Sequence, residues 1–299
     1  SANAWLLIIL LIPFLGLPLY FFFGSTYLSR RRHRIQKEAH AEINDVHADF
    51  PDVPSSVRLS GDVASMARLN RTLTGYPAVE GHVEALWSDY QKTMLRIAEL
   101  IDASTSLVFL CSPNNPTGAV LSTADFRAFM ARVPEHVTVA LDEAYFEFNR
   151  DPDAVNGQEV WRDYPNLLCL RTFSKAYGLA GVRVGYAFGN AELVTAVNKV
   201  GVPFQVSAVA QAGAIASLEH SEELLARVED TIEVRDEVAD KIGAARSQAN
   251  FVWVPFDDPE RAPAIADRLA QHGVLVRAFP EGLRITVTNR DETDELLSA

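Results

Sequence analysis

Residues 166–178 read NLLCLRTFSKAYG, a predicted strand followed by a turn. Its first half is an apolar, β-rich run, and its second half is a turn that carries hydroxyl groups and a lysine. Open α/β sheets bind their ligands beyond the carboxyl ends of their strands. Thr172, Ser174 and Lys175 follow the run directly, so the sequence puts two hydroxyls and an amine where a ligand is expected.

Runs of the same kind lie on both sides of this stretch and alternate with helical patterns. The β-rich runs and the helical patterns between them are found at residues 106–111, 123–133, 136–145, 183–188 and 191–200. Such alternation is the βαβ signature of a parallel sheet. We therefore expect an α/β fold, with a mostly parallel sheet in a large domain over residues 107–200.

The pattern changes after residues 202–204, VPF. Two long helical stretches follow, then a strand around residues 250–254, another helix, and strands near residues 274–277 and 283–287. This order indicates a smaller α+β domain over residues 201–299.

Two further polar segments stand at the ends of predicted strands. Residues 112–118, SPNNPTG, follow the first run, and Asp142 and Tyr145 close the second within the letters DEAY. Each has an ordinary structural explanation. PNNPTG is a good turn by composition, and an aspartate that ends a strand often caps a helix. A lone lysine after a strand is usually solvated, so none of these features alone assigns a function.

Together these residues match the needs of pyridoxal 5′-phosphate. That cofactor requires an amine for a Schiff base, a carboxylate for the pyridine nitrogen, and cationic or hydroxyl donors for its phosphate. Lys175 supplies the amine and Asp142 the carboxylate. Thr172, Ser174 and Arg183 are the expected phosphate ligands, and Arg183 offers a bidentate fork. The sequence therefore predicts a pyridoxal-phosphate site.

This constellation resembles the fold-type I, class I/II aminotransferases from about Val108 to the end of the chain. The similarity is greatest to their histidinol-phosphate and aromatic amino-acid branch. It implies that Asn115 and Tyr145 hydrogen-bond the phenolic oxygen of the cofactor and that Asp142 pairs with its ring nitrogen. It also implies that Lys175 forms the Schiff base and then moves a proton between substrate and cofactor.

The resemblance extends to the substrate. Arg284, in GLRITV, matches the arginine that grips the substrate carboxylate, and Asn250, in SQANF, lies on a strand near the substrate. The family usually has glycine where this chain has Thr288, so we expect a small change in the local backbone. The implied reaction moves an amino group between histidinol phosphate or an aromatic amino acid and 2-oxoglutarate. Pairing of two copies as a homodimer is compatible with this family.

At the other end of the chain, residues 5–23 carry no charged side chain. At 1.5 Å per residue a helix over this run covers roughly 28 Å, about the hydrocarbon thickness of a bilayer. A basic block follows at once: Arg30, Arg31, Arg32, Arg34 and Lys37. A signal peptide carries its charges before the apolar run, and Pro13 and Pro18 suit a soluble core helix poorly. We expect residues 1–37 to be a transmembrane anchor in a bacterial inner membrane, with the rest of the chain cytoplasmic.

Residues 38–106 offer no site. Residues 38–70 are polar and acidic, with Pro51 and Pro54 set to interrupt any helix, and we expect a connector there. Apolar residues at helical spacing then predict one amphipathic helix over residues 82–103.

The anchor, the basic block and residues 69–87 resemble the start of bacterial cardiolipin synthase. That family uses a histidine nucleophile in a His-x-Lys motif. None of the seven histidines here is followed two positions later by lysine, so a lipid-modifying enzyme would lack its nucleophile.

The bulk composition narrows the remaining classes. A formal net charge of -12 argues against a general nucleic-acid binder, which normally has a basic surface. Two cysteines are too few for a disulfide framework, and the scattered histidines form no pair at metal-ligand spacing. We expect small-molecule partners, an amino acid and a 2-oxo acid, and no metal.

The resembling family carries further elements before the PNNPTG segment. They include a phosphate-binding turn, an aromatic ring that stacks on the cofactor, and a residue that reaches the neighbouring subunit. Here the cardiolipin-synthase-like piece takes their place, with the changeover near residues 104–108. We therefore expect an incomplete large-domain sheet and weak transamination. The alternative is a non-enzymatic, membrane-tethered fusion of two incomplete halves.

Overall fold

The computed structural model describes residues 34, 41, 45, 48–53, 58–74, 76–78, 90–201 and 205–298. The chain divides into two compact units, residues 1–83 with 198–200, and residues 84–197 with 201–299. The transmembrane segment predicted at residues 5–23 lies outside the described residues. Within the described ranges, every helix is too short or too polar to cross a membrane.

The first unit contains a helix where the sequence predicts a connector. Helix α4 spans Gly61–Thr74, so the stretch in which the sequence predicts a connector contains a helix. Pro51 and Pro54 stand before the helix and do not interrupt it. Asp62 in the first turn and Arg71 in the last turn have the charges that the helix dipole favours at each end.

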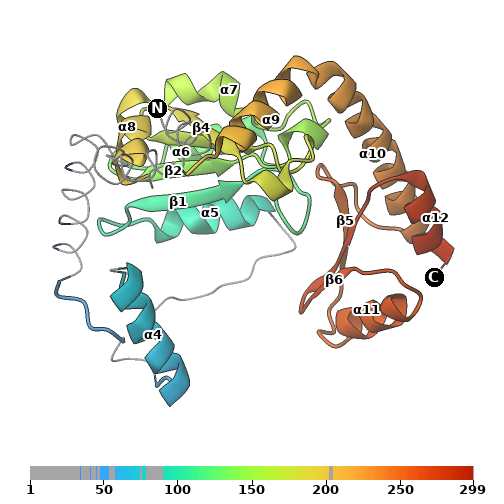
Figure 1. The fold of residues 1–299 in the computed structure, drawn as a ribbon, viewed down its shortest axis with the longest axis horizontal. Helices are drawn as coiled ribbons and strands as arrows, with labels where there is room; N and C mark the ends of the chain where they lie inside the picture. The colour runs from blue at the N-terminus through green and yellow to red at the C-terminus, as the bar shows by residue number, and fades with distance from the viewer. Residues whose placement is uncertain are drawn as a thin grey trace, which may run out of the picture. The chain divides into compact units, whose positions relative to one another are not determined.

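The second unit holds a four-stranded sheet in the order β1-β2-β3-β4 (Figure 1). Strands β1 (Leu107–Cys111), β2 (Thr138–Asp142) and β3 (Leu167–Thr172) run parallel. Strand β4 (Gly185–Gly189) pairs antiparallel with β3. The prediction of a mostly parallel sheet in an α/β fold is confirmed.

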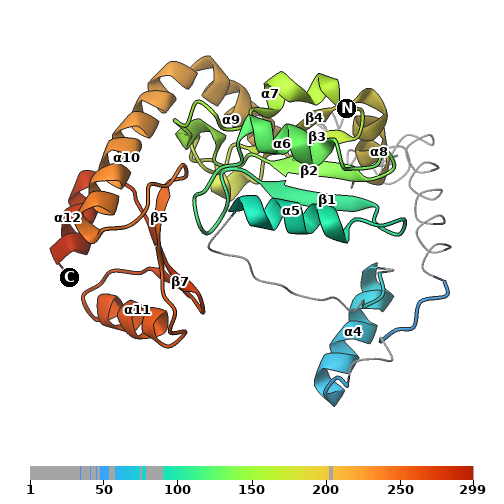
Figure 2. The same cartoon turned by 180° about the vertical axis from the view of Figure 1, so that it is seen from behind.

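Two helices cover one face of this sheet, as Figure 2 shows. They are α5 (Tyr90–Leu100) and α6 (Thr123–Met130). Met94 of α5 and Phe126 of α6 are buried in a core with alternate residues of the strands. The helix predicted over residues 82–103 is therefore found at 90–100, and residues 79–89 are outside the described ranges.

Several shorter elements and two helices surround the strands. The short turns of helix are η1 (Phe146–Phe148), α7 (Gly157–Val160), η2 (Trp161–Asp163) and η3 (Ala180–Val182). Helices α8 (Ala191–Val200) and α9 (Ala208–Glu219) follow β4. Ala210 and Ala214 of α9 pack against Phe173 and Val184, which places this helix beside the turn after β3.

The C-terminal part forms a three-stranded antiparallel sheet in the order β5-β7-β6. Its elements are α10 (Ser221–Ile242), β5 (Phe251–Pro255), α11 (Arg261–Gln271), β6 (Arg277–Phe279), β7 (Gly282–Thr286) and α12 (Arg290–Ser298). The strand predicted at residues 274–277 begins only at Arg277. Gly273, at a φ of 83°, lies in the turn after α11. Residues 274–276 connect this turn to the sheet, so the strand starts later than predicted. Helix α12 was not predicted from the sequence.

Candidate active site

The three polar segments meet at one edge of the large sheet. In the parallel register, Cys111 lies beside Asp142, and Asp142 lies beside Leu170. The chain therefore leaves β1, β2 and β3 at adjacent points. Residues 112–118, the turn after Asp142 and the turn after Thr172 begin side by side, at the edge where open α/β sheets bind ligands.

Lys175 and Tyr145 are brought together at this edge. The Lys175 side chain is exposed, and its Nζ lies 5.2 Å from the centroid of the Tyr145 ring. Lys175 also lines a hollow of about 620 Å³ together with Asn250 and Thr288. The Lys175 amine is thus accessible to a small molecule in this hollow. Such access is required of a group that forms a covalent bond with a ligand.

Asp142 and Tyr145 are positioned by the turn that follows β2. Asp142 is half-buried, and its Oδ1 accepts a hydrogen bond from the backbone N–H of Ala144 at 3.0 Å. Tyr145 is 4% exposed and meets Phe251 of β5 edge-on, with ring centroids 5.2 Å apart. A residue of the small sheet therefore packs against the aromatic side chain of the turn after β2.

The proposed phosphate ligands occupy two successive turns. The Thr172 Oγ1 accepts a hydrogen bond from the Ser174 N–H at 3.0 Å, which tightens the turn before Lys175. Arg183 adopts a left-handed conformation, with φ 56° and ψ 60°, which is costly for a residue other than glycine. Its Nη1 donates to the backbone oxygen of Ala180 at 2.8 Å. Thr172 and Ser174 are thus joined directly, whereas Arg183 is bonded within its own turn.

Arg284 and Asn115 meet across the two sheets. The Arg284 Nη1 donates to the Asn115 Oδ1 at 2.8 Å, and the guanidinium lies 5.1 Å from the Phe251 ring centroid. The Arg284 Nε is buried and has no hydrogen-bond partner among the described residues. A buried donor without an acceptor is costly, and a carboxylate is the natural acceptor for a guanidinium.

Asn250 directly precedes Phe251, the first residue of β5. The backbone oxygen of Asn250 accepts a hydrogen bond from the Val287 N–H at 2.9 Å, and its side chain lines the hollow that holds Lys175. The predicted residues therefore form two neighbouring groups, one around Lys175 and one around Arg284. An amine, a carboxylate, hydroxyls and an unsatisfied guanidinium nitrogen fit a phosphate-bearing aldehyde cofactor and a carboxylate substrate.

Sequence reasoning missed a buried ion pair beneath the site. The Arg171 Nε donates to the Glu143 Oε2 at 3.0 Å, and both side chains are buried. Burial raises the pKa of Glu143, and the Arg171 charge opposes that rise. The signal was available, because an arginine at the end of the apolar run LLCLRT is unusual and Glu143 directly follows Asp142.

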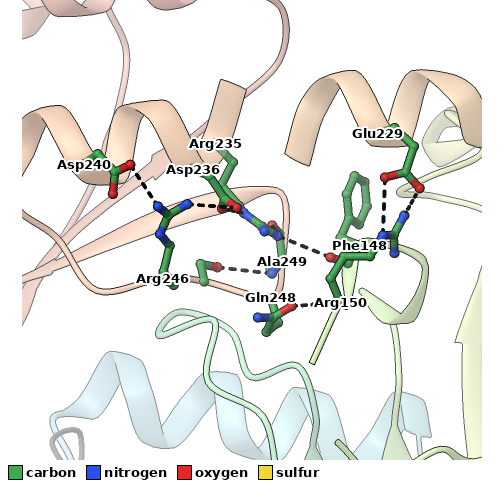
Figure 3. Close-up of polar contacts among 10 residues, drawn as sticks. Phe148, Arg150, Glu229, Arg235, Asp236, Asp240, Arg246, Gln248 and Ala249 are labelled. Atoms are coloured by element: carbon green, nitrogen blue, oxygen red, sulfur yellow. Dashed lines mark hydrogen bonds and ion pairs between the residues drawn. The ribbon is translucent and has the colours of Figure 1, made fainter. Parts of the chain in front are cut away.

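Sequence reasoning also missed a group of arginines that join the two sheets (Figure 3). Arg235 of α10 is 2% exposed, and its Nη1 donates to the backbone oxygens of Phe148 and Ala249 at 3.2 and 3.0 Å. The Arg150 N–H donates to the Gln248 Oε1 at 2.7 Å. These bonds attach the lead-in of β5, and with it Asn250, to the turn that follows Tyr145.

The family model described as Aminotransferase class I and II matches residues 65–299. The chain belongs to this family. A second model, Phospholipase_D-nuclease N-terminal, matches residues 1–25, in agreement with the resemblance of that end to cardiolipin synthase.

Curated relatives include the aromatic amino acid aminotransferases of Corynebacterium diphtheriae and Corynebacterium efficiens. The first is 57% identical over 215 residues, which are 72% of this chain and 62% of the relative. The second is 59% identical over 201 residues, which are 67% of this chain and 58% of the relative. This aminotransferase-family chain therefore spans about three fifths of the length of these relatives.

Solved structures give the same fold. Histidinol-phosphate aminotransferase from Sinorhizobium meliloti, in complex with pyridoxal-5′-phosphate, has a TM-score of 0.63 and 33% identity. The match covers 71% of this chain and 60% of that one. A putative histidinol-phosphate aminotransferase from Erwinia carotovora has a TM-score of 0.62 at 21% identity, over 87% of this chain and 77% of that one. The predicted fold and cofactor class are confirmed at the level of the family.

Proposed function

We propose that this chain binds pyridoxal 5′-phosphate through Lys175 and transfers an amino group between an aromatic amino acid and a 2-oxo acid. The observation that carries the proposal is the placement of Lys175 5.2 Å from the Tyr145 ring, at the edge where Asp142 ends β2. The names of the relatives support an aromatic donor, and 2-oxoglutarate is the acceptor that the resemblance of the sequence implies. Histidinol phosphate is the alternative donor, supported by the Sinorhizobium structure.

Each site residue has a role that its position suits. Lys175 provides the amine that holds the cofactor and later accepts and returns a proton. Asp142 keeps the ring nitrogen protonated, and Tyr145 donates a hydrogen bond to the phenolic oxygen. When bound, the cofactor would supply an electron sink at the reacting carbon of the substrate.

Other residues hold the charged groups at either end of the site. Thr172, Ser174 and Arg183 provide hydroxyl and guanidinium donors for the phosphate. Arg284 grips the substrate carboxylate, and the strongest structural support is its buried Nε, which has no hydrogen-bond partner in the part of the chain that the structure describes. Asn115 also donates to the phenolic oxygen, and Asn250 faces the substrate.

The test of the cofactor assignment is chemical labelling. The full chain is incubated with pyridoxal phosphate, reduced with borohydride and digested, and the labelled peptide is mapped. We expect the label on Lys175 and its loss in Lys175→Ala. Lys199→Ala, at an exposed position of α8, is the matched control and should keep the label. Label confined to another lysine would refute the assignment.

A second candidate, cofactor binding without turnover, is favoured by two observations. The chain matches about three fifths of its relatives, and the edge strand β1 leaves Phe109 65% exposed. The two candidates are separated by a single-turnover assay, in which phenylalanine or tyrosine is mixed with the loaded protein. Formation of the corresponding 2-oxo acid in an amount equal to bound cofactor supports the enzyme. Label on Lys175 without product supports a non-enzymatic, membrane-tethered fusion.

Residues 5–23 are proposed to anchor the chain in a membrane, with the aminotransferase part on the cytoplasmic side. The match of residues 1–25 to a phospholipase-D-type N-terminal segment supports this proposal. Carbonate extraction should leave the full chain in the membrane pellet, and a chain from residue 38 onward should be released. Release of the full chain would contradict the anchor. Light scattering of the purified protein tests the homodimer.

A further inference from the structure

Two charged side chains are buried directly beside the proposed site. Glu143 is 0% exposed and Arg171 is 7% exposed, yet neither was expected to take part in the chemistry. Glu143 follows Asp142 in the chain, and Arg171 precedes Thr172. The ion pair therefore lies one residue away from a proposed cofactor ligand on each of two adjacent strands.

The alternation of side chains along a strand sets the direction of each neighbour. Arg171 shares a face of β3 with Leu167 and Cys169, which belong to the core under α6. Thr172 points to the opposite face. Glu143 continues the alternation of Val139 and Leu141 from β2 into the same core. The pair thus ties the two strand ends together on the core side, while Asp142 and Thr172 point to the other side.

The pair makes further contacts within the large domain. The Glu143 Oε1 accepts a hydrogen bond from the Gly157 N–H at 2.7 Å. The Arg171 Nη2 donates to the Asn156 Oδ1 at 3.0 Å, and its guanidinium lies 3.6 Å from the Phe146 ring centroid. Four segments of the large domain therefore meet at one ion pair: the ends of β2 and β3, the start of α7, and η1.

Stability alone is a weak reason for this arrangement. Desolvation offsets much of the attraction in a buried ion pair, and well-packed apolar side chains of similar volume often do as well. Geometry is a better reason. Charge-assisted hydrogen bonds fix two side chains in direction as well as distance, and residues that support a site in this way control how well its ligands are placed.

We infer that the Glu143–Arg171 pair is a clamp that positions Asp142 and the Thr172–Lys175 turn for pyridoxal phosphate. Glu143 and Arg171 are positioning residues, because they act through their neighbours in the chain. The inference rests on the proposed function for its ligand, but the clamp itself is a property of the unloaded chain. Loss of the clamp should loosen the two turns first and weaken cofactor binding as a result.

The decisive variant removes the clamp without leaving a buried charge. Glu143→Leu combined with Arg171→Met keeps the volume apolar but leaves the buried Gly157 N–H without its acceptor, so the chain should fold with a modestly lower urea midpoint than the wild type. The matched control is Arg127→Gln with Asp163→Asn, which removes an exposed ion pair of 3.0 Å away from the strand ends.

Two measurements are made on the full chain of each variant. Without cofactor, hydrogen exchange reports the amides of Ala144 and Ser174, which bond to Asp142 and Thr172. With pyridoxal phosphate, absorbance titration gives the dissociation constant and the pH midpoint of the bound cofactor band. In the apolar variant we expect faster exchange at both amides, roughly tenfold weaker binding, and a shifted pH midpoint. The control should match the wild type in all three.

Each outcome decides the inference. An apolar variant that folds normally and keeps wild-type exchange, affinity and pH midpoint would overturn it. If that variant fails to fold, Glu143→Gln takes its place, because its amide oxygen still accepts from the Gly157 N–H. The same three changes, in smaller size, are then expected, and their absence overturns the clamp. If the wild type takes up no pyridoxal phosphate, the proposed function is wrong, and the exchange rates alone decide the clamp.

Discussion

Arg284 and Asn115 are 169 positions apart in the chain, and their side chains are joined by a hydrogen bond of 2.8 Å. One belongs to the proposed substrate group and the other to the proposed cofactor group. The bond uses the Arg284 Nη1 and leaves the buried Nε without a partner among the described residues. The guanidinium is therefore held in place by a neutral amide and keeps its full charge for a carboxylate.

Replacing that neutral amide by a carboxylate should weaken substrate binding. In Asn115→Asp, the new charge would pair with Arg284 and compete with the substrate carboxylate, because charge-assisted pairs are about twice as strong as neutral ones. We expect the dissociation constant for phenylalanine to rise about tenfold, which corresponds to ~1.4 kcal/mol. Spectral titration of the loaded protein measures it. Asn114→Asp is the control, since the Asn114 side chain bonds to Thr117. An unchanged constant in Asn115→Asp would refute the competition.

A methyl group at Gly157 should destabilise the fold. A Cβ there would lie 2.6 Å from the Cys169 Sγ and 2.6 Å from the Glu143 Oε2, both of which are in the packed interior. We expect Gly157→Ala to lower the free energy of unfolding by about 1–3 kcal/mol through overpacking. Gly181→Ala, where nothing lies within 4 Å, should change it little. Urea denaturation compares the two, and equal stabilities would contradict the close approach.

Arg183 should lower the stability of the cofactor-free chain and strengthen its binding of pyridoxal phosphate. The left-handed backbone of Arg183 costs a non-glycine residue about 1–2 kcal/mol in the folded state, and glycine would remove this cost. Part of the resulting stabilisation is offset, because glycine also raises the conformational entropy of the unfolded chain. We expect Arg183→Gly to stabilise the cofactor-free chain by roughly 0.5 kcal/mol and to bind pyridoxal phosphate more weakly. Urea denaturation and absorbance titration test both parts. Tighter cofactor binding in the glycine variant would show that Arg183 is no phosphate ligand.

The two cysteines should be unreactive in the folded chain. Burial raises the pKa of Cys111 to about 11 and that of Cys169 to about 12. The fraction of thiolate at pH 8 is then small, and modification by a disulfide reagent should be about 100-fold slower than for an exposed thiol. Urea should restore fast reaction of both. Rapid modification of one thiol in the native protein would contradict this.

The same thiols make stability depend on pH in the alkaline range. Their folded-state pKa values lie above the ordinary value of 9.0, so the unfolded chain loses its thiol protons first. The free energy of unfolding should therefore fall as pH rises from about 9 towards 11. Cys169→Ala should reduce the slope, as measured by urea denaturation at several pH values. An unchanged slope would assign the effect to other groups.

The strands of the large sheet and their polar ends are predictable from the sequence because each is a short apolar run closed by a turn. The residues that hold those ends in place are less visible. Glu143 and Arg171 act through a contact between strands that are joined by a long connection, and no local pattern pairs them. Helix α4 is hidden for a different reason, since the prolines that suggest a connector precede it.

In the candidate site, too, some residues are predicted by local motifs and others depend on contacts between distant segments. Lys175, Asp142 and Tyr145 follow from their motifs, and the structure places Lys175 beside Tyr145. The bond between Arg284 and Asn115 depends on how the small sheet lies against the large one. That arrangement rests on buried contacts such as those of Arg235, which have no signature in the sequence.

Phe251 gives the two halves of the site a common wall. Its ring touches Tyr145 edge-on at 5.2 Å, and the Arg284 guanidinium lies 5.1 Å from the same ring. A shift of this ring would change the surroundings of both side chains at once. We therefore expect that filling the proposed substrate group and filling the proposed cofactor group influence each other through Phe251, and any such influence is reciprocal.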